Sequence, residues 1–256
     1  MNMKAHTEGI RAMVFKGFYN LDIAENSSDK ARAKECADIA AILTPIIKCY
    51  GSETAVKMEC EAMQVLGGVG YTKEYPVEQY LRDSKVLTIW EGTSFIQAKD
   101  LVGRKMNMEK GEPFKKWMES IKHFITTNKG TSGFEKETAV LEKAYECAEI
   151  IWRLIISWQA NKDEKGELVN LYAIRVLFVF AQLYVATCLL EQAVVCNKII
   201  TGLSHDHFDL NFYQGKIASA RYYVHNVLPE VFTLARIIKN ADNTVLEVPE
   251  DALIIP

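Results

Sequence analysis

The sequence predicts a folded, all-α protein, and three observations support this prediction. The 256 residues contain only 14 glycines and 6 prolines, fewer than a sheet sandwich needs for its frequent turns. Long stretches place apolar residues at helical spacing, beginning with Ile10, Met13, Val14 and Phe18. Hydrophobic residues make up 49% and charged residues 25%, which is ordinary for a folded, soluble chain and excludes disorder.

The N-terminal part predicts five helices, over residues 1–24, 29–49, 53–66, 77–90 and 93–105. Ser27 or Ser28 is expected to cap the second helix. Pro45 removes one backbone hydrogen bond within that helix and therefore predicts a kink or an end. Gly51 and Ser52 are expected to separate the second helix from the third, with Ser52 as the cap.

The C-terminal part predicts longer helices, over residues 114–127, 134–161, 166–202 and 208–239. Short loops between them favour an antiparallel bundle, and Pro229 predicts a kink in the last helix. Residues 106–113 (MNMEKGEP) are the first polar stretch with both glycine and proline. We therefore expect a linker there, between one domain over 1–105 and a second over 114–256. The tail after residue 242 ends apolar and is expected to lie irregularly against a surface.

Charge and composition exclude several classes of function. A net charge of −3 provides no broad basic surface for nucleic acid. The 15 uncharged residues between Arg175 and Glu191 are fewer than the roughly 18 that a membrane span needs, so they predict a buried helix. The six cysteines form no CxxC pair and follow no secretory leader, which is typical of reduced thiols in a cytoplasmic protein.

Residues 64–97 hold the first pattern that could carry chemistry, a pair of glycines at a helix end. Gly67 and Gly68 present bare backbone N–H groups there, and another backbone or a ligand can approach them closely. The structural alternative is a simple glycine helix stop, and spacing alone favours this alternative.

The second pattern is an acidic residue at the start of a helix. Glu91 lies between Trp90 and Gly92, before a helix that Thr93 or Ser94 caps. A carboxylate beside an indole is expected to be partly desolvated, which would make it a usable base. An acidic residue that only stabilises the helix dipole is the alternative, and it is favoured without further information.

Two other polar groups have structural interpretations. A cluster at His205, Asp206, His207 and Asp209 contains metal-binding residue types, but an acidic helix cap or first-turn residue explains it better, so no metal is expected. Arg82 and Asp83 are interpreted as a structural ion pair rather than as residues that orient the Glu91 segment.

Two motifs in this segment resemble those of the C-terminal helical domain of acyl-CoA dehydrogenases, in the same order and with the same separation. They are QVLGGVGY at residues 64–71 and EYPVEQYLRDSKVLTIWEGTSFIQ at residues 74–97. The motif-bearing match covers roughly residues 55–104. The following AKDLVGRKM at 98–106 is similar to a subfamily with an extra C-terminal helical domain, and the expected linker falls at the same point.

The resemblance implies α,β-dehydrogenation of a fatty acyl-CoA thioester, with FAD as hydride acceptor and an electron-transfer flavoprotein as electron acceptor. By resemblance, Glu91 is the base that removes the α-proton, its backbone N–H helps to hold the thioester oxygen, and Gly92 touches the substrate. The positions matching contacts to FAD are Thr93, Ser94 and Phe95. Those matching contacts to the FAD of a neighbouring subunit are Gln64, Val65, Leu66, Gly67 and Gly68.

The sequence also departs from the family. The N-terminal helical domain, the middle β-domain and the first long helix of the C-terminal domain have no counterpart in it. We therefore expect a fragment, a truncated product or one subunit of a split enzyme, which alone binds flavin weakly or not at all. Trp90 replaces the commoner tyrosine, and Phe95 stands where a smaller or polar residue is frequent, so both narrow the expected pocket.

The missing parts also affect the expected assembly. They would leave an apolar face of the first helices uncovered, which predicts a homo-oligomer or a partner subunit that carries the β-domain. The competing interpretation of the whole chain is a non-catalytic helical oligomerisation or scaffold subunit. A nucleic-acid-binding relative is disfavoured because the second domain has no basic excess.

Overall fold

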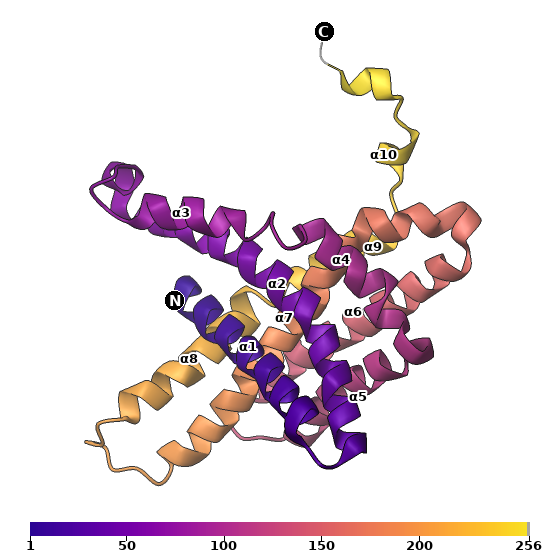
Figure 1. Cartoon of the computed structure of the whole chain (residues 1–256). Helices are drawn as coiled ribbons and strands as arrows, with labels where there is room; N and C mark the ends of the chain where they lie inside the picture. The colour runs from indigo at the N-terminus through magenta and orange to yellow at the C-terminus, as the bar shows by residue number, and fades with distance from the viewer. Residues whose placement is uncertain (255–256) are drawn as a thin grey trace.

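The computed structural model describes residues 1–254, except for the side chains of residues 162–164, and within that range it is helical with no strand. Its elements, where η marks a short 3-10 helix, are α1 (Asn2–Asn26), α2 (Lys30–Leu66), η1 (Gly67–Tyr71), α3 (Val77–Val86), α4 (Ser94–Gly103), η2 (Lys105–Gly111), α5 (Glu112–Asn128), α6 (Glu135–Ala160), α7 (Lys162–Ile200), α8 (Leu210–Asn226), α9 (Glu230–Asn240), α10 (Thr244–Glu247) and η3 (Glu250–Leu253). The predicted all-α class is confirmed (Figure 1).

Helix α7 is the centre of the molecule. It packs against α1, α2 and α4 from the N-terminal part and against α5, α6, α8 and α9 from the C-terminal part. Side chains along its middle, such as Phe180, Leu183 and Val185, are inaccessible to solvent. The helix is long and apolar enough to cross a membrane, but 83% of its apolar window is buried within the fold. This is the environment of a core helix, as predicted for residues 175–191.

The start of α2 corrects the predicted cap. Asp29 is the N-cap residue, and its side chain accepts hydrogen bonds from the backbone N–H groups of Ala31 and Arg32 at 3.0 and 3.2 Å. A carboxylate in this position satisfies two otherwise unpaired donors of the first turn. Ser27, which the sequence offered as a cap, instead accepts from the backbone N–H of Asp29 at 3.2 Å.

The predicted interruption within α2 is also wrong, because residues 30–66 form one continuous helix. Ser52 is buried, and its hydroxyl donates to the Lys48 carbonyl at 2.7 Å within the helix rather than capping a new one. Serine can bond backward along a helix in this way without ending it. Pro45 is buried inside α2 and does not end it either.

Residues on both sides of the expected linker share one hydrophobic core. Met13 of α1 and Trp117 of α5 belong to the same cluster of buried side chains, and so does Met106 from the linker itself. The hydroxyls of Tyr50 in α2 and Tyr223 in α8 are hydrogen-bonded at 2.7 Å in the interior. The segment expected to be a polar linker is thus folded into η2 and the start of α5, and the helices before and after it pack together.

The C-terminal end differs from the prediction in two respects. The helix expected over 208–239 is two helices, because α8 ends at Asn226 and Pro229 precedes α9 as its N-cap. The tail with α10 and η3 extends away from the helical body (Figure 1), and Leu253 is 65% exposed. Val245 at the start of the tail lines a hollow with Tyr172 and Arg175 of α7, whereas the tail end at Leu253 and Ile254 is exposed. Residues 255–256 lie outside the described residues.

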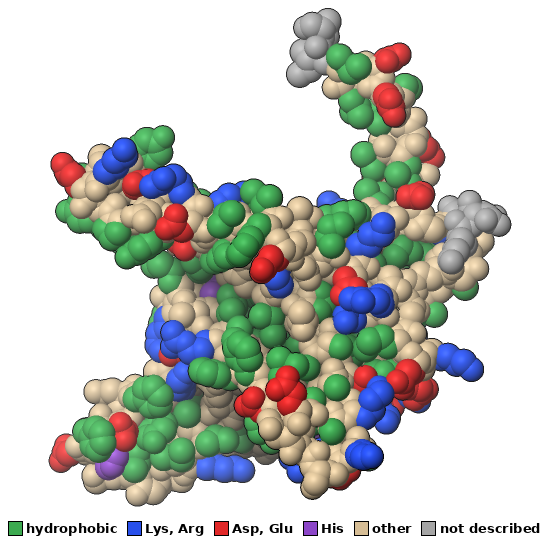
Figure 2. Space-filling model, in the orientation of Figure 1, with side chains coloured by type: hydrophobic (Ala, Val, Ile, Leu, Met, Phe, Trp, Pro, Cys, Tyr) green, Lys and Arg blue, Asp and Glu red, His purple; other side chains and the backbone are tan. Residues whose placement is uncertain are grey.

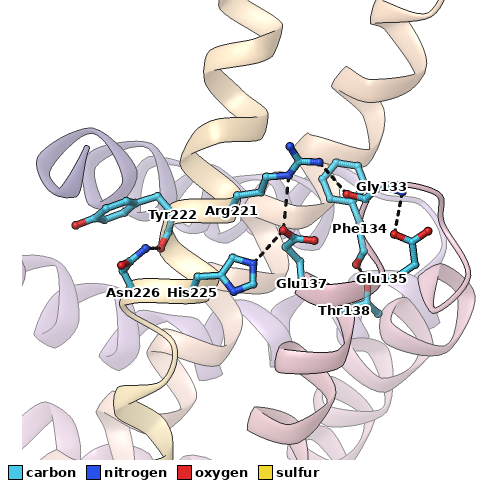
Figure 3. Close-up of polar contacts among 9 residues, drawn as sticks. All are labelled: Gly133, Phe134, Glu135, Glu137, Thr138, Arg221, Tyr222, His225 and Asn226. Atoms are coloured by element: carbon cyan, nitrogen blue, oxygen red, sulfur yellow. Dashed lines mark hydrogen bonds and ion pairs between the residues drawn. The ribbon is translucent and has the colours of Figure 1, made fainter.

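A polar cluster joins the start of α6 to α8 at the edge of the core (Figure 3). The buried Glu137 places Oε1 at 3.0 Å from His225 Nε2 and at 3.6 Å from Arg221 Nε. Arg221 also donates to the Gly133 carbonyl at 2.8 Å and lies over the ring of Phe134. The cluster thus fixes the orientation of α8 on α6 by polar contacts.

Candidate functional site

The two predicted motifs lie on and beside an arm that projects from the helical body. The arm consists of the C-terminal end of α2 together with η1 and α3, and the chain returns from it to the body at α4 (Figure 1). Figure 2 shows hydrophobic side chains interspersed with charged ones over the same arm. Both motifs lie within residues 64–97. The glycine motif ends α2 and forms η1, whereas Glu91 lies in the segment between α3 and α4.

The glycine pair at the tip of α2 stops the helix and is also open to approach. Gly67 has φ +65°, and its N–H donates to the Gln64 carbonyl as the last bond of the helix. A Cβ atom on Gly67 or Gly68 would meet nothing within 4 Å. Gln64 and Val65 are exposed, and Leu66 is half-buried. The helix-stop interpretation is correct, and the surrounding surface is free within this chain.

Glu91 occupies a strained backbone conformation. Its φ of +54° lies in the left-handed region, which residues other than glycine rarely adopt, and Gly92 follows with φ +92°. The predicted break between the two helices is therefore confirmed. Holding a non-glycine residue there costs about 1–3 kcal/mol and is frequent at functional sites.

The expected desolvation of Glu91 is absent from this chain. The glutamate is exposed, and the neighbouring Trp90 is 55% exposed, so the indole does not cover the carboxylate. Within residues 1–254 the backbone N–H of Glu91 also donates to no backbone or side-chain group of the protein. Both groups are therefore available to another molecule.

Contacts from α2 hold the segment between α3 and α4, residues 87–93, which we call the Glu91 loop. Lys48 Nζ donates to the carbonyl of Gly92, and Glu53 Oε1 accepts from the hydroxyl of Ser94 just after the loop. The backbone N–H of Ser94 donates to the Thr88 carbonyl at 3.1 Å and closes the loop. Sequence reasoning missed Lys48 and Glu53, which lie 44 and 41 residues from their partners and match no local pattern.

The start of α4 completes this geometry. Thr93 caps the helix by accepting from the Ile96 N–H at 3.4 Å, as predicted. The side chain of Gln97 donates to the Glu91 carbonyl at 3.2 Å. Ser94 is buried and bonded, whereas Thr93 and Phe95 are exposed. Thr93 and Phe95 therefore offer free surface, and Ser94 supports the loop.

The polar residues His205, Asp206, His207 and Asp209 do not form a metal site in the described part of the chain. His205 and Asp206 are fully exposed, and His207 Nδ1 accepts from the Asp209 backbone N–H at 3.2 Å. No group of three or more His, Cys, Asp or Glu side chains in the described part of the chain could hold a metal ion.

The expected ion pair between Arg82 and Asp83 is replaced by another. Arg82 pairs with Glu78, one helical turn earlier, at 3.1 Å.

A surface hollow of about 540 Å³ lies between α2 and α5 and includes Lys34 and Glu109 but no residue of 64–97.

Two family models divide the chain between them. "Acyl-CoA dehydrogenase, C-terminal domain" matches residues 1–106, and "Acetyl-CoA dehydrogenase C-terminal like" matches residues 117–249. These matches agree with the all-helical fold and identify the chain as a helical C-terminal region of the dehydrogenase type. The chain belongs to the acyl-CoA dehydrogenase family.

Similar proteins are much longer than this chain. A butyryl-CoA dehydrogenase of Syntrophomonas wolfei subsp. wolfei is 37% identical over 250 residues, which are 98% of this chain and 40% of that protein. The broad-specificity linear acyl-CoA dehydrogenase FadE5 of Mycobacterium tuberculosis is 31% identical, over 98% of this chain and 42% of its own length. The chain therefore spans about 40% of the length of these curated relatives.

Solved structures show the same fold. An acyl-CoA dehydrogenase complexed with FAD from Bacillus anthracis superimposes with a TM-score of 0.68 at 18% identity, over 94% of this chain and 42% of that chain. Caenorhabditis elegans ACDH-11 in complex with C11-CoA gives a TM-score of 0.60 at 24% identity, over 86% of this chain and 34% of that chain.

Proposed function

We propose that this chain is the C-terminal part of a flavin-dependent acyl-CoA dehydrogenase in which Glu91 removes the α-proton of an acyl-CoA thioester. The observation that supports this role is the placement of Glu91, exposed at a strained turn directly before α4 and flanked by residues that α2 anchors. Strain of this kind persists only where surrounding contacts enforce it, and it clusters at active sites. The similarity to butyryl-CoA and broad-specificity acyl-CoA dehydrogenases supports the same role.

The reaction needs a base and a donor close together. The α-proton of a thioester is weakly acidic, so its removal requires stabilisation of the negative charge that develops on the thioester oxygen. The Glu91 carboxylate accepts the α-proton, and the backbone N–H of the same residue donates to the thioester oxygen. Gly92 lies beside the substrate. Bound flavin supplies the acceptor for the hydride that leaves the β-carbon.

The described residues fit a flavin dinucleotide at two places. Gly67 and Gly68 have open space where a Cβ atom would lie. With Gln64, Val65 and Leu66 they would form the part of the site that reaches the FAD of a neighbouring subunit. Thr93 and Phe95 at the start of α4 face the chain's own FAD, and Ser94 supports them because Glu53 already engages its hydroxyl.

The wider assembly belongs to the same proposal. Residues 1–105 form the dehydrogenase C-terminal domain, 106–113 the connection, and 114–256 an additional helical domain. The whole enzyme is a cytoplasmic oligomer, or includes a subunit with the β-domain, and passes electrons to an electron-transfer flavoprotein. Exposed apolar side chains support association: Phe15 and Phe18 on α1 and Phe212 on α8 are exposed. Figure 2 shows hydrophobic groups on the α7–α8 hairpin.

Anaerobic mixing of butyryl-CoA with the flavin-loaded whole protein tests the role of Glu91. The whole protein is this chain together with the part that supplies the β-domain. Loss of the oxidised-flavin absorbance is followed over time for the wild type and for Glu91→Gln. The amide cannot accept the α-proton, so we expect bleaching to slow by about 10²–10⁴-fold, the usual contribution of a general base. Bleaching of Glu91→Gln at the wild-type rate would refute the proposed base.

The same preparation distinguishes the competing scaffold function. Flavin is titrated into the purified 256-residue chain alone and into the chain with the polypeptide that supplies the β-domain. A catalytic part binds flavin tightly in at least one of these states. A stable oligomer that takes up flavin in neither state would instead support a non-catalytic oligomerisation subunit.

A further inference from the structure

We propose that Lys48 and Glu53 of α2 are positioning residues that hold the Glu91 loop in its strained conformation. The proposal rests on the function proposed above. It assigns a role to two residues that lie outside both sequence motifs. One acts as a donor before α4 and the other as an acceptor at its first residue. Together they fix the chain from Gly92 to Ser94, directly after Glu91.

Lys48 has an unusual partner for a lysine. It is half-buried on α2, and its ammonium group donates to the Gly92 backbone carbonyl. Among the described residues it forms no ion pair within 4.0 Å. Removing an ammonium group from water is costly, so a half-buried lysine usually has a compensating partner. Here that partner is the carbonyl next to the strained residue, through a charge-assisted bond.

Glu53 makes the second contact on the same helix. It lies five residues after Lys48, which places the two about 7.5 Å apart along the helix axis. Its carboxylate accepts from the hydroxyl of Ser94, two residues after Gly92. One contact alone would allow the loop to rotate about it, whereas two contacts on one rigid helix fix its orientation.

The part of α2 that carries Lys48 and Glu53 is also anchored in the core. Cys49 and Tyr50 are buried, and Tyr50 is hydrogen-bonded to Tyr223 of α8. The additional helical domain therefore contributes to the rigidity of the helix that carries Lys48 and Glu53. Positioning of this kind matters because a base displaced by about 1 Å can lose on the order of 10²-fold in rate.

Hydrogen exchange in the 256-residue chain, without any flavin, tests whether Lys48 and Glu53 act as a clamp on the Glu91 loop. Lys48→Met keeps the apolar stem and removes the donor, and Glu53→Gln keeps the shape and removes the charge. We expect the peptide over residues 86–95, which includes the Ser94 N–H, to exchange about tenfold faster in Lys48→Met, because loop opening becomes easier. Lys57→Met is the matched control, since Lys57 is exposed on the same helix and bonds to no part of the loop. Wild-type exchange in both Lys48→Met and Glu53→Gln would overturn the proposal.

Kinetics of the flavin-loaded whole protein separate positioning from general structural damage. We expect Lys48→Met to lower kcat for butyryl-CoA by about 10²-fold with little change in KM. Lys48→Arg, which keeps a donor, should recover part of the loss. A change confined to KM, or no recovery by arginine, would argue against positioning.

The two proposals fail separately. Faster exchange in Lys48→Met together with unaltered bleaching in Glu91→Gln would keep the clamp and remove the base. Unaltered exchange together with lost bleaching in Glu91→Gln would do the reverse.

Discussion

The middle of α7 and the Glu91 loop differ in burial and in backbone strain. In α7, side chains such as Leu183 are fully enclosed by helices from both parts of the molecule. In the loop, Glu91 is exposed, its backbone is strained, and a few polar contacts to α2 hold it. The core therefore supplies the free energy of folding, and the loop uses part of it to maintain a conformation that the local sequence would not adopt alone.

Truncation of a core residue on α7 is expected to have the largest effect on stability. Leu183→Ala should lower the free energy of unfolding by about 2–5 kcal/mol, because it removes fully buried methyl groups and leaves a cavity. Val195→Ala, on an exposed face of the same helix, should change it by less than about 0.5 kcal/mol. Denaturant unfolding measures both. Equal effects of the two substitutions would contradict the central position of α7.

Removal of the buried carboxylate between α6 and α8 should have an intermediate effect. Glu137→Ala leaves Arg221 and His225 without their shared partner, so we expect a loss of about 1–3 kcal/mol in the free energy of unfolding. Glu142→Ala is a suitable control, because Glu142 lies on the same helix and pairs with Lys129 at the surface. If both substitutions cost the same in denaturant unfolding, the Glu137 cluster is not a structural link.

The smallest effect is expected in the loop and has the opposite sign. Glu91→Gly relieves the cost of a positive φ but adds backbone freedom to the unfolded chain, so we expect a net gain in stability of about 0.5–1 kcal/mol. The same variant should lose bleaching activity in the flavin-loaded protein. Thermal unfolding of the variant and the wild type under identical conditions measures the difference. A clear decrease would mean that the positive φ of Glu91 is not a source of strain.

The fold was largely predictable because helical spacing and helix breakers are local signals. The spacing of apolar residues predicted α1, and the break at Glu91 and Gly92 followed from residue type. The errors occurred where distant contacts decide. Ser52 was predicted to be a cap, yet its hydroxyl bonds back to the Lys48 carbonyl, and its neighbours Tyr50 and Thr54 are buried within one continuous helix. The apolar tail was predicted to lie against a surface, but only its start at Val245 adjoins the body, and Leu253 and Ile254 are exposed.

The candidate site was predictable only in part. Glu91 and the glycine pair lie in short motifs, so a resemblance could indicate them. Lys48 and Glu53 could not be found in this way, because a lysine and a glutamate five residues apart on a helix are typical of any solvated face. Their role depends on a loop that folds back across more than 40 residues of chain. The predicted desolvation of Glu91 was wrong because adjacency in sequence does not determine burial. Trp90 is next to Glu91, but both residues are exposed.

The continuity of α2 sets a strict length requirement. This single helix carries Lys48 and Glu53 against the Glu91 loop and ends at Gly67, about 28 Å from Lys48 and about 21 Å from Glu53 along its axis. Substitutions between Glu53 and Gln64 leave that spacing intact. One inserted residue, by contrast, would turn the glycine end by about 100° relative to the loop, since a helix has 3.6 residues per turn. We therefore expect homologues of this chain to vary in sequence between Glu53 and Gln64 but to keep the number of residues there.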